Sequence, residues 1–179
     1  MKFISLLRGI NVSGQKAIKM SDLKSLYQEI GFQNVVTYIQ SGNVVFDAES
    51  TNSSSAKKKI QSAIESKYHF QVPVEIRTNH QISKIIEACP FDSIDLAENG
   101  TKVLLTFLSD SPLKKNIDEL MKHVIGPDQL IINGKAVYLY CPNGYGKSKL
   151  SNNFLEKRLG VDATTRNWKT VQKLYELSS

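Results

Sequence analysis

The chain of 179 residues has few cysteines and histidines, and it has no long apolar segment. Its two cysteines, Cys89 and Cys141, form no metal-binding or redox spacing, and two isolated thiols fit a reducing cytoplasm. The three histidines (His69, His80 and His123) are far apart and form no metal-ligand pattern. No segment approaches the roughly 20 apolar residues that a membrane-spanning helix needs, and the N-terminal apolar run is too short for a secretory signal. We therefore expect a cytoplasmic protein with no membrane association, no metal and no cofactor.

The recognisable spacings of catalytic residues are also absent. Neither a catalytic triad nor a pair of carboxylates nor a metal cluster is visible as a pattern along the chain. An active site assembled in space from lysine, serine and tyrosine side chains stays open, because sequence spacing does not reveal such an assembly.

Positive charge is present, and it is concentrated at the two ends of the chain. The formal net charge is +6. Residues 135–179 hold eight Lys/Arg against three Asp/Glu, and residues 1–22 hold four against one, whereas the middle of the chain is slightly acidic. Such ends suit an anionic partner, either a phosphorylated small molecule or a nucleic acid. A solvated basic face explains the same charges equally well.

Strand and helix patterns follow one another in the same order in both halves of the chain. In the first half we predict strands at residues 3–7, 35–40, 43–46 and 72–77, a helix starting at Ser21 and a helix after residue 55. In the second half we predict a strand at 102–108, a helix after Ser111-Pro112, a hairpin of 129–132 and 136–140 around Asn133-Gly134, and a helix over 148–159.

These patterns predict an α+β fold made of two ferredoxin-like halves, residues 1–78 and 79–179, as an internal duplication with mixed or antiparallel sheets. The second half is expected to differ at its end. There, residues 161–167 and a terminal helix replace the closing strand.

A glycine-rich basic loop follows the second strand of that hairpin. Residues 146–148 match the last three positions of the phosphate-binding pattern G-x-x-x-x-G-K-[ST], but Cys141 occupies the first glycine position. We therefore expect a simpler anion-binding loop rather than a nucleoside triphosphatase. In it the glycines free the backbone, Lys147 and Lys149 add charge, and Ser148 caps the next helix. An ordinary strand-to-helix connection is the competing interpretation.

A second polar stretch, residues 164–168, precedes the last helix. Arg166 has the planar fork that suits phosphate or carboxylate, and Asn167 can cap the helix. Trp168 can stack on a base, although a tryptophan at a helix start more often packs in a core. We predict that residues 143–149 and 164–168 form one basic site. The other candidate ligand-binding residues in loops are Arg8, Asn11, Ser41, Asn43 and Tyr145.

Three parts of the sequence resemble one known family. They are LRGINV at residues 7–12, TYIQSGNVVF at 37–46, and GYGKSKL at 144–150 together with ATTRNW at 163–168. Over nearly its full length the chain resembles the bacterial family called domain of unknown function 1697 (DUF1697). The resemblance implies a small cytoplasmic α/β protein with ferredoxin-like halves, and it implies no activity. Ser13 departs from the family pattern, which commonly has a glycine beside Gly14.

Three functions stay open at this point. The first is a binding protein for an anionic small molecule or a nucleic acid, which uses the two basic loops. The second is an enzyme acting on a phosphorylated or acyl small molecule, with Tyr145, Lys147, Ser148 and Arg166 near the chemistry. The third is a structural or partner-binding module. RNA recognition on the sheet would need exposed aromatic residues, and we expect most of them to be buried. We rank anion binding first, and the sequence does not indicate an oligomeric state.

Overall fold

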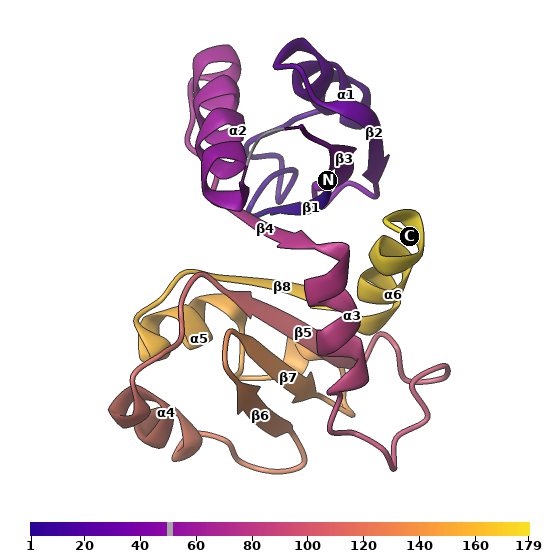
Figure 1. Ribbon diagram of the computed structural model, residues 1–179. Helices are drawn as coiled ribbons and strands as arrows, with labels where there is room; N and C mark the ends of the chain where they lie inside the picture. The colour runs from indigo at the N-terminus through magenta and orange to yellow at the C-terminus, as the bar shows by residue number, and fades with distance from the viewer. Residues whose placement is uncertain (50–51) are drawn as a thin grey trace. The chain divides into compact units, whose positions relative to one another are not determined.

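The computed structural model describes residues 1–49 and 52–179 of the protein (Figure 1). Within these residues the chain forms six α-helices and eight strands, and the strands make two four-stranded antiparallel sheets. The chain divides into two compact units, residues 1–83 with 174–179, and residues 84–173. It passes from one unit to the other within α3 (Asn79–Glu87) and again within α6 (Trp168–Leu177). No helix of the described residues is long and apolar enough to cross a membrane.

The first unit is a sheet with two helices on one face. Its elements are β1 (Lys2–Leu7), α1 (Met20–Glu29), β2 (Gln33–Tyr38), β3 (Asn43–Asp47), α2 (Ser53–Tyr68) and β4 (Val74–Thr78). The strand order is β2-β3-β1-β4. Because side chains alternate along a strand, Phe3 and Leu7 point to the same face as Val44 and Phe46 of the neighbouring strand. The apolar stripes of α1 and α2 close this core, and Tyr27 is its largest helical member.

The second unit repeats the same order of elements. It contains β5 (Val103–Leu108), α4 (Lys114–Met121), β6 (Gln129–Asn133), β7 (Ala136–Tyr140), a 3₁₀ turn η1 (Tyr145–Lys147), α5 (Asn152–Leu159) and β8 (Ala163–Asn167). The strand order, β6-β7-β5-β8, corresponds position by position to that of the first sheet. Leu104 and Leu139 of the sheet pack with Leu120 of α4 and Leu155 of α5 in its core.

The predicted hairpin is confirmed, and the predicted end of the second half is wrong. Asn133 pairs with Ala136 across a turn in which Gly134 has a φ of +57°. Residues 163–167, predicted to replace a closing strand, form β8 and pair with β5 along five residues. β8 therefore takes the place in the second sheet that β4 takes in the first. Every pairing in both sheets is antiparallel, so neither sheet is mixed.

Candidate functional site

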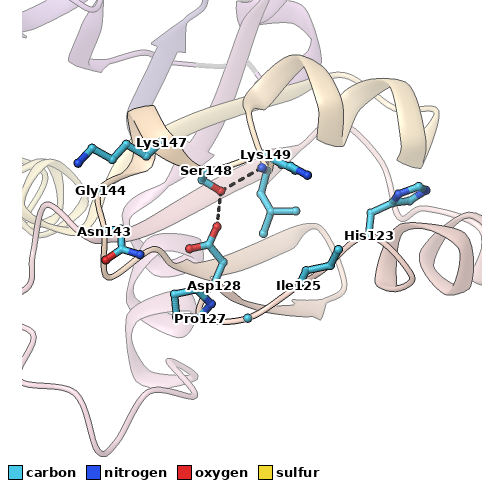
Figure 2. Close-up of a pocket in the computed structure, with 11 residues that line it drawn as sticks. His123, Ile125, Pro127, Asp128, Asn143, Gly144, Lys147, Ser148 and Lys149 are labelled. Carbon is cyan, nitrogen blue, oxygen red and sulfur yellow. Dashed lines mark hydrogen bonds between the residues drawn. The ribbon is translucent and has the colours of Figure 1, made fainter.

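A pocket of the second unit contains most of the predicted glycine-rich loop. It has a volume of about 440 Å³ and lies between residues 123–128, which lead from α4 to β6, and residues 143–150, which follow β7 (Figure 2). The hairpin explains this neighbourhood. Gln129 at the start of β6 pairs with Tyr140 at the end of β7, so the segment before β6 and the segment after β7 lie at the same end of the sheet.

A hydrogen bond between Ser148 and Asp128 joins the two walls of the pocket. The Ser148 hydroxyl donates to Asp128 Oδ2 at 2.7 Å and accepts from the backbone N–H of Leu150 at 3.0 Å. Behind the pair lies the buried thiol of Cys141. Burial raises the pKa of this thiol, the Ser148 hydroxyl lowers it, and the charge of Asp128 raises it further. The raised pKa keeps Cys141 protonated at neutral pH, and a protonated thiol is a poor nucleophile.

The positive charge of the pocket comes from Lys147 and Lys149. Both residues are exposed. Figure 2 shows that they flank Ser148 and that their side chains point in opposite directions. Within the described part of the chain neither amine has a carboxylate partner within 4.0 Å, Asp128 included. His123 lines the far end of the pocket, where its ring meets Phe154 edge-on at 5.6 Å. The pocket is therefore bordered by cations and has one carboxylate at its base.

Three backbone amides of the loop are used within the loop itself. The N–H groups of Gly144, Lys147 and Ser148 donate within the loop to the carbonyls of Cys141, Gly144 and Tyr145, at 2.9–3.1 Å. These three amides are consequently not available to an anion, so the lysine side chains are the main source of attraction in the pocket.

The prediction that Ser148 caps a helix is wrong. Helix α5 begins at Asn152, and its N-cap is Ser151, whose hydroxyl accepts from the Phe154 N–H at 3.2 Å. Ser148 instead has an extended backbone conformation at the end of η1, where its hydroxyl joins the pocket walls.

The second predicted stretch meets the loop without lining the pocket. Burial raises the pKa of Tyr145, and its neighbour Thr165 lowers that pKa, which places the tyrosine against β8. The Tyr145 hydroxyl is nevertheless buried without a hydrogen bond of normal geometry among the described residues. Thr165 also contacts Thr106 Oγ1 at 2.7 Å and donates to Asn152 Oδ1 at 2.8 Å. Tyr145 thus lies beside a half-buried polar cluster that joins β8 to β5 and α5, and no residue of 164–168 lines the cavity.

Arg166 lies on the opposite face of the sheet from Thr165, because neighbouring residues of a strand alternate. Its guanidinium donates to the Thr165 carbonyl at 2.9 Å, and burial lowers its pKa to about 10. Arg166 is half-buried on this face, where its hydrogen bond holds the guanidinium against β8 and outside the pocket.

The two residues after Arg166 serve the last helix. Asn167 Oδ1 accepts from the Thr170 N–H at 2.9 Å, so the prediction that Asn167 caps α6 is confirmed. Trp168 is only 1% exposed, so its indole is packed inside the protein and does not offer a stacking surface.

The remaining predicted residues belong to the first unit and hold two of its turns together. Asn11, which has a φ of +55°, donates to the carbonyls of Ile18 and Gln40 at 2.9 Å and accepts from the Ile18 N–H. Asn43 is fully buried and donates to the Tyr38 carbonyl and to Ser41 Oγ. Arg8 lies after β1, in the loop that contains Asn11, and its backbone N–H donates to the Pro73 carbonyl at 3.0 Å.

Sequence reasoning missed the wall of the pocket formed by residues 123–128. This segment contains His123, the exposed Ile125, a cis Gly126–Pro127 bond and Asp128. A signal was available, because the Asn133-Gly134 turn fixes the register of the hairpin. That register places the residues before position 129 beside the residues after position 140.

Comparison with known proteins adds a family and a fold. A model of the family described as protein of unknown function (DUF1697) matches residues 1–138, so the match ends before the loop 143–150. No curated protein matches the chain. A solved structure of the conserved bacterial protein SP0830 from Streptococcus pneumoniae is similar to it, with a TM-score of 0.79 and 20% sequence identity over 99% of this chain and 98% of that one. At this identity the similarity shows that the two proteins share a fold, and it says nothing about activity.

Proposed function

The chain belongs to the DUF1697 family, whose description assigns no activity, and from the geometry of its pocket we propose that it binds a small phosphorylated or otherwise anionic molecule between residues 123–128 and 143–150. The observation that carries this proposal is that Lys147 and Lys149 line one cavity and have no carboxylate partner within the described residues. Unpaired lysines beside a pocket of about 440 Å³ favour the binding of a ligand that carries negative charge.

The expected affinity is modest. An exposed ammonium that comes within about 4 Å of an anion contributes between roughly 1 and 4 kcal/mol, depending on how much water remains between them. The Asp128 carboxylate opposes part of this attraction. Two flexible lysines also lose rotamer freedom when they close on a ligand, which lowers the affinity further. These terms favour a compact anion whose charge sits near Lys147 or Lys149 and away from Asp128.

Binding explains the site better than covalent catalysis does. The pKa values of Cys141 and Tyr145 are raised by burial, so both groups are protonated and poor nucleophiles at neutral pH. Ser148 is hydrogen-bonded directly to a carboxylate, without a histidine between them to accept its proton. Stacking of a nucleic-acid base on Trp168 or Tyr138 is disfavoured in turn, because each of these residues is only 1% exposed.

The repeated strand order supports a common origin of the two halves. We infer that residues 1–78 and 79–179 are copies of one ferredoxin-like β-α-β-β-α-β motif, because both sheets follow the same order of neighbours. We also place the protein in the cytoplasm, which two free cysteines support.

Calorimetric titration tests the proposed function. Inorganic phosphate, pyrophosphate and citrate are titrated into the full chain at low salt. Lys147→Ala and Lys149→Ala should each weaken binding by roughly fivefold, about 1 kcal/mol, because each removes one cation. Asp128→Asn should strengthen binding by a similar factor, because it removes the repelling charge.

The matched control is Lys115→Ala, which changes net charge equally on the exposed side of α4, away from the pocket. Absence of binding by all three anions at low salt would remove the proposal. Equal weakening by Lys115→Ala would reduce the effect to general charge attraction.

A further inference from the structure

Strand β6 lies at an open edge of its sheet, since the strand order is β6-β7-β5-β8 (Figure 1). All five of its residues pair with β7 in one continuous register, from Gln129 opposite Tyr140 to Asn133 opposite Ala136. Within the described part of the chain, no other segment hydrogen-bonds to its outer side. The outer side therefore presents a straight row of backbone donors and acceptors, to which another strand can be added.

The other three edge strands each carry a feature that discourages such pairing. In β2 the register shifts near its start, and a bulge of this kind twists an edge away from a partner. β4 carries Glu75 and Arg77, and β8 carries Arg166, and charged residues on an edge disfavour addition of a strand. β6, with the sequence QLIIN, has neither a bulge nor a charge, and its central Ile131 is 42% exposed.

We propose that β6 pairs antiparallel with β6 of a second copy of the chain, so that two of these sheets join in a symmetric dimer. Such a contact is isologous, because the same strand serves both partners. One register pairs all five residues of both strands. In it Ile131 lies opposite the partner's Ile131, and Leu130 lies opposite the partner's Ile132. Gln129 lies opposite the partner's Asn133.

The sequence of β6 is complementary to itself in that register. The two isoleucines at the centre cover each other, and the amide side chains at the ends can exchange hydrogen bonds. This complementarity is what selects a second copy of the chain over an unrelated strand. The dimer is independent of the proposed anion site and goes beyond it.

Sedimentation velocity across a broad range of protein concentration tests the dimer. The full chain should pass from monomer to dimer as its concentration rises. Ile131→Lys and Ile131→Glu should each raise the dissociation constant by about tenfold or more, because each places two like charges opposite each other and removes an apolar contact. An equimolar mixture of the two variants should restore the dimer, because it places Lys opposite Glu.

Val36→Lys is the matched control, since Val36 is 41% exposed on β2 and its change should leave the dimer intact. Circular dichroism establishes that each variant is folded, which Ile131 permits because it is largely outside the core. A wild-type chain that stays monomeric at every concentration overturns the proposal. So does a single Ile131 variant that dimerises like the wild type, or a mixture that stays monomeric.

Discussion

Among individual residues, Gly42 shows most clearly why a family motif is a structural requirement. Its φ is +82°, and a Cβ added there would lie 2.6 Å from Ile10 Cδ1 and 2.8 Å from Leu7 Cβ. Ile10 is 2% exposed and Leu7 is fully buried, so neither can move aside. The TYIQSGNVVF and LRGINV segments therefore fit together because the turn has no side chain at this point.

Gly42→Ala should lower the free energy of unfolding by about 2–4 kcal/mol, from backbone strain at positive φ and from overpacking. Gly14→Ala is its control in the same unit, since Gly14 has a φ of +74° and open space where the methyl would lie. That variant should lose only about 1 kcal/mol, from backbone strain alone. Urea unfolding of both variants measures the difference. Equal losses would mean that the contacts at Gly42 do not matter.

Tyr138 gives the protein a pH dependence in the alkaline range. Its hydroxyl donates to the Ile85 carbonyl at 2.9 Å. Burial, with a smaller contribution from Cys89, raises its pKa to about 12 from an ordinary value of 10.0. Between these two values the folded state holds a proton that the unfolded state has lost. The stabilisation is therefore complete below pH 10 and is lost as pH rises toward 12.

In Tyr138→Phe this loss should disappear, so its unfolding free energy should fall less steeply above pH 10 than that of the wild type. At most about 1.4 kcal/mol per pH unit is at stake for one group. Below pH 10 the variant should be weaker by about 1 kcal/mol, because one hydrogen bond is missing. Urea midpoints measured from pH 8 to pH 11 decide the matter, and parallel curves at all pH values would contradict the assignment.

For helices and strands, residue patterns along the chain predicted most of the elements. They did not predict the first residues of α1, α4 and α5. The Asn133-Gly134 hairpin could be predicted because its turn is encoded by two adjacent residues. Helices were predicted to start at Ser21 and after Ser111-Pro112, yet α1 and α4 start after Lys19 and Leu113, and neither has a side-chain cap. A serine near a helix start therefore does not by itself identify the N-cap.

Strand β8 was missed for a different reason. Its sequence, ATTRN, has few apolar residues and polar side chains on both faces, so it lacks the alternation that identifies a strand. Pairing with β5 makes it a strand, and β5 lies about sixty residues earlier in the chain. Contacts between residues so far apart leave no local signal. The face on which Arg166 lies could not be predicted for the same reason.

The start of α5 offers a test at the level of one element. Ser151→Ala should lower the free energy of unfolding by about 1 kcal/mol, because it removes the hydroxyl that accepts from the Phe154 N–H. Ser151→Asp should preserve stability, because its carboxylate can accept the same bond and favours a helix N-terminus. Thermal or urea unfolding provides the measurement. A fully stable Ser151→Ala variant would show that α5 does not depend on this cap.

In the molecule as a whole, the repeated order of elements was readable from sequence, and the path of the last residues was not. Residues 174–179 return to the first unit, where Asn79 donates to Ser178 Oγ at 2.9 Å. No pattern in a short terminal segment indicates which unit will receive it. The sequence also revealed the excess of positive charge in the C-terminal region, but in the structure these positive residues do not gather at one site. Lys147 and Lys149 border the pocket, whereas Arg166 is half-buried on β8 and lies outside it.

The functional account therefore depends on the pocket formed by 123–128 and 143–150 rather than on a union of two basic loops. Asp128 and Ser148 fix its shape, and the lysines give it positive charge. Sequence reasoning found the loop and its cations because glycine and lysine are visible in a motif. It missed the opposite wall because residues 123–128 carry no motif of their own and come beside the loop only through the pairing of β6 with β7.

Titration of inorganic phosphate into ¹⁵N-labelled protein, followed by amide chemical shifts, tests the anion pocket most directly. The account predicts saturable shifts confined to residues 143–150 and to the amides near Asp128, and their loss in a Lys147→Ala, Lys149→Ala double variant. Shifts that never saturate and spread over surface lysines throughout the chain would contradict it.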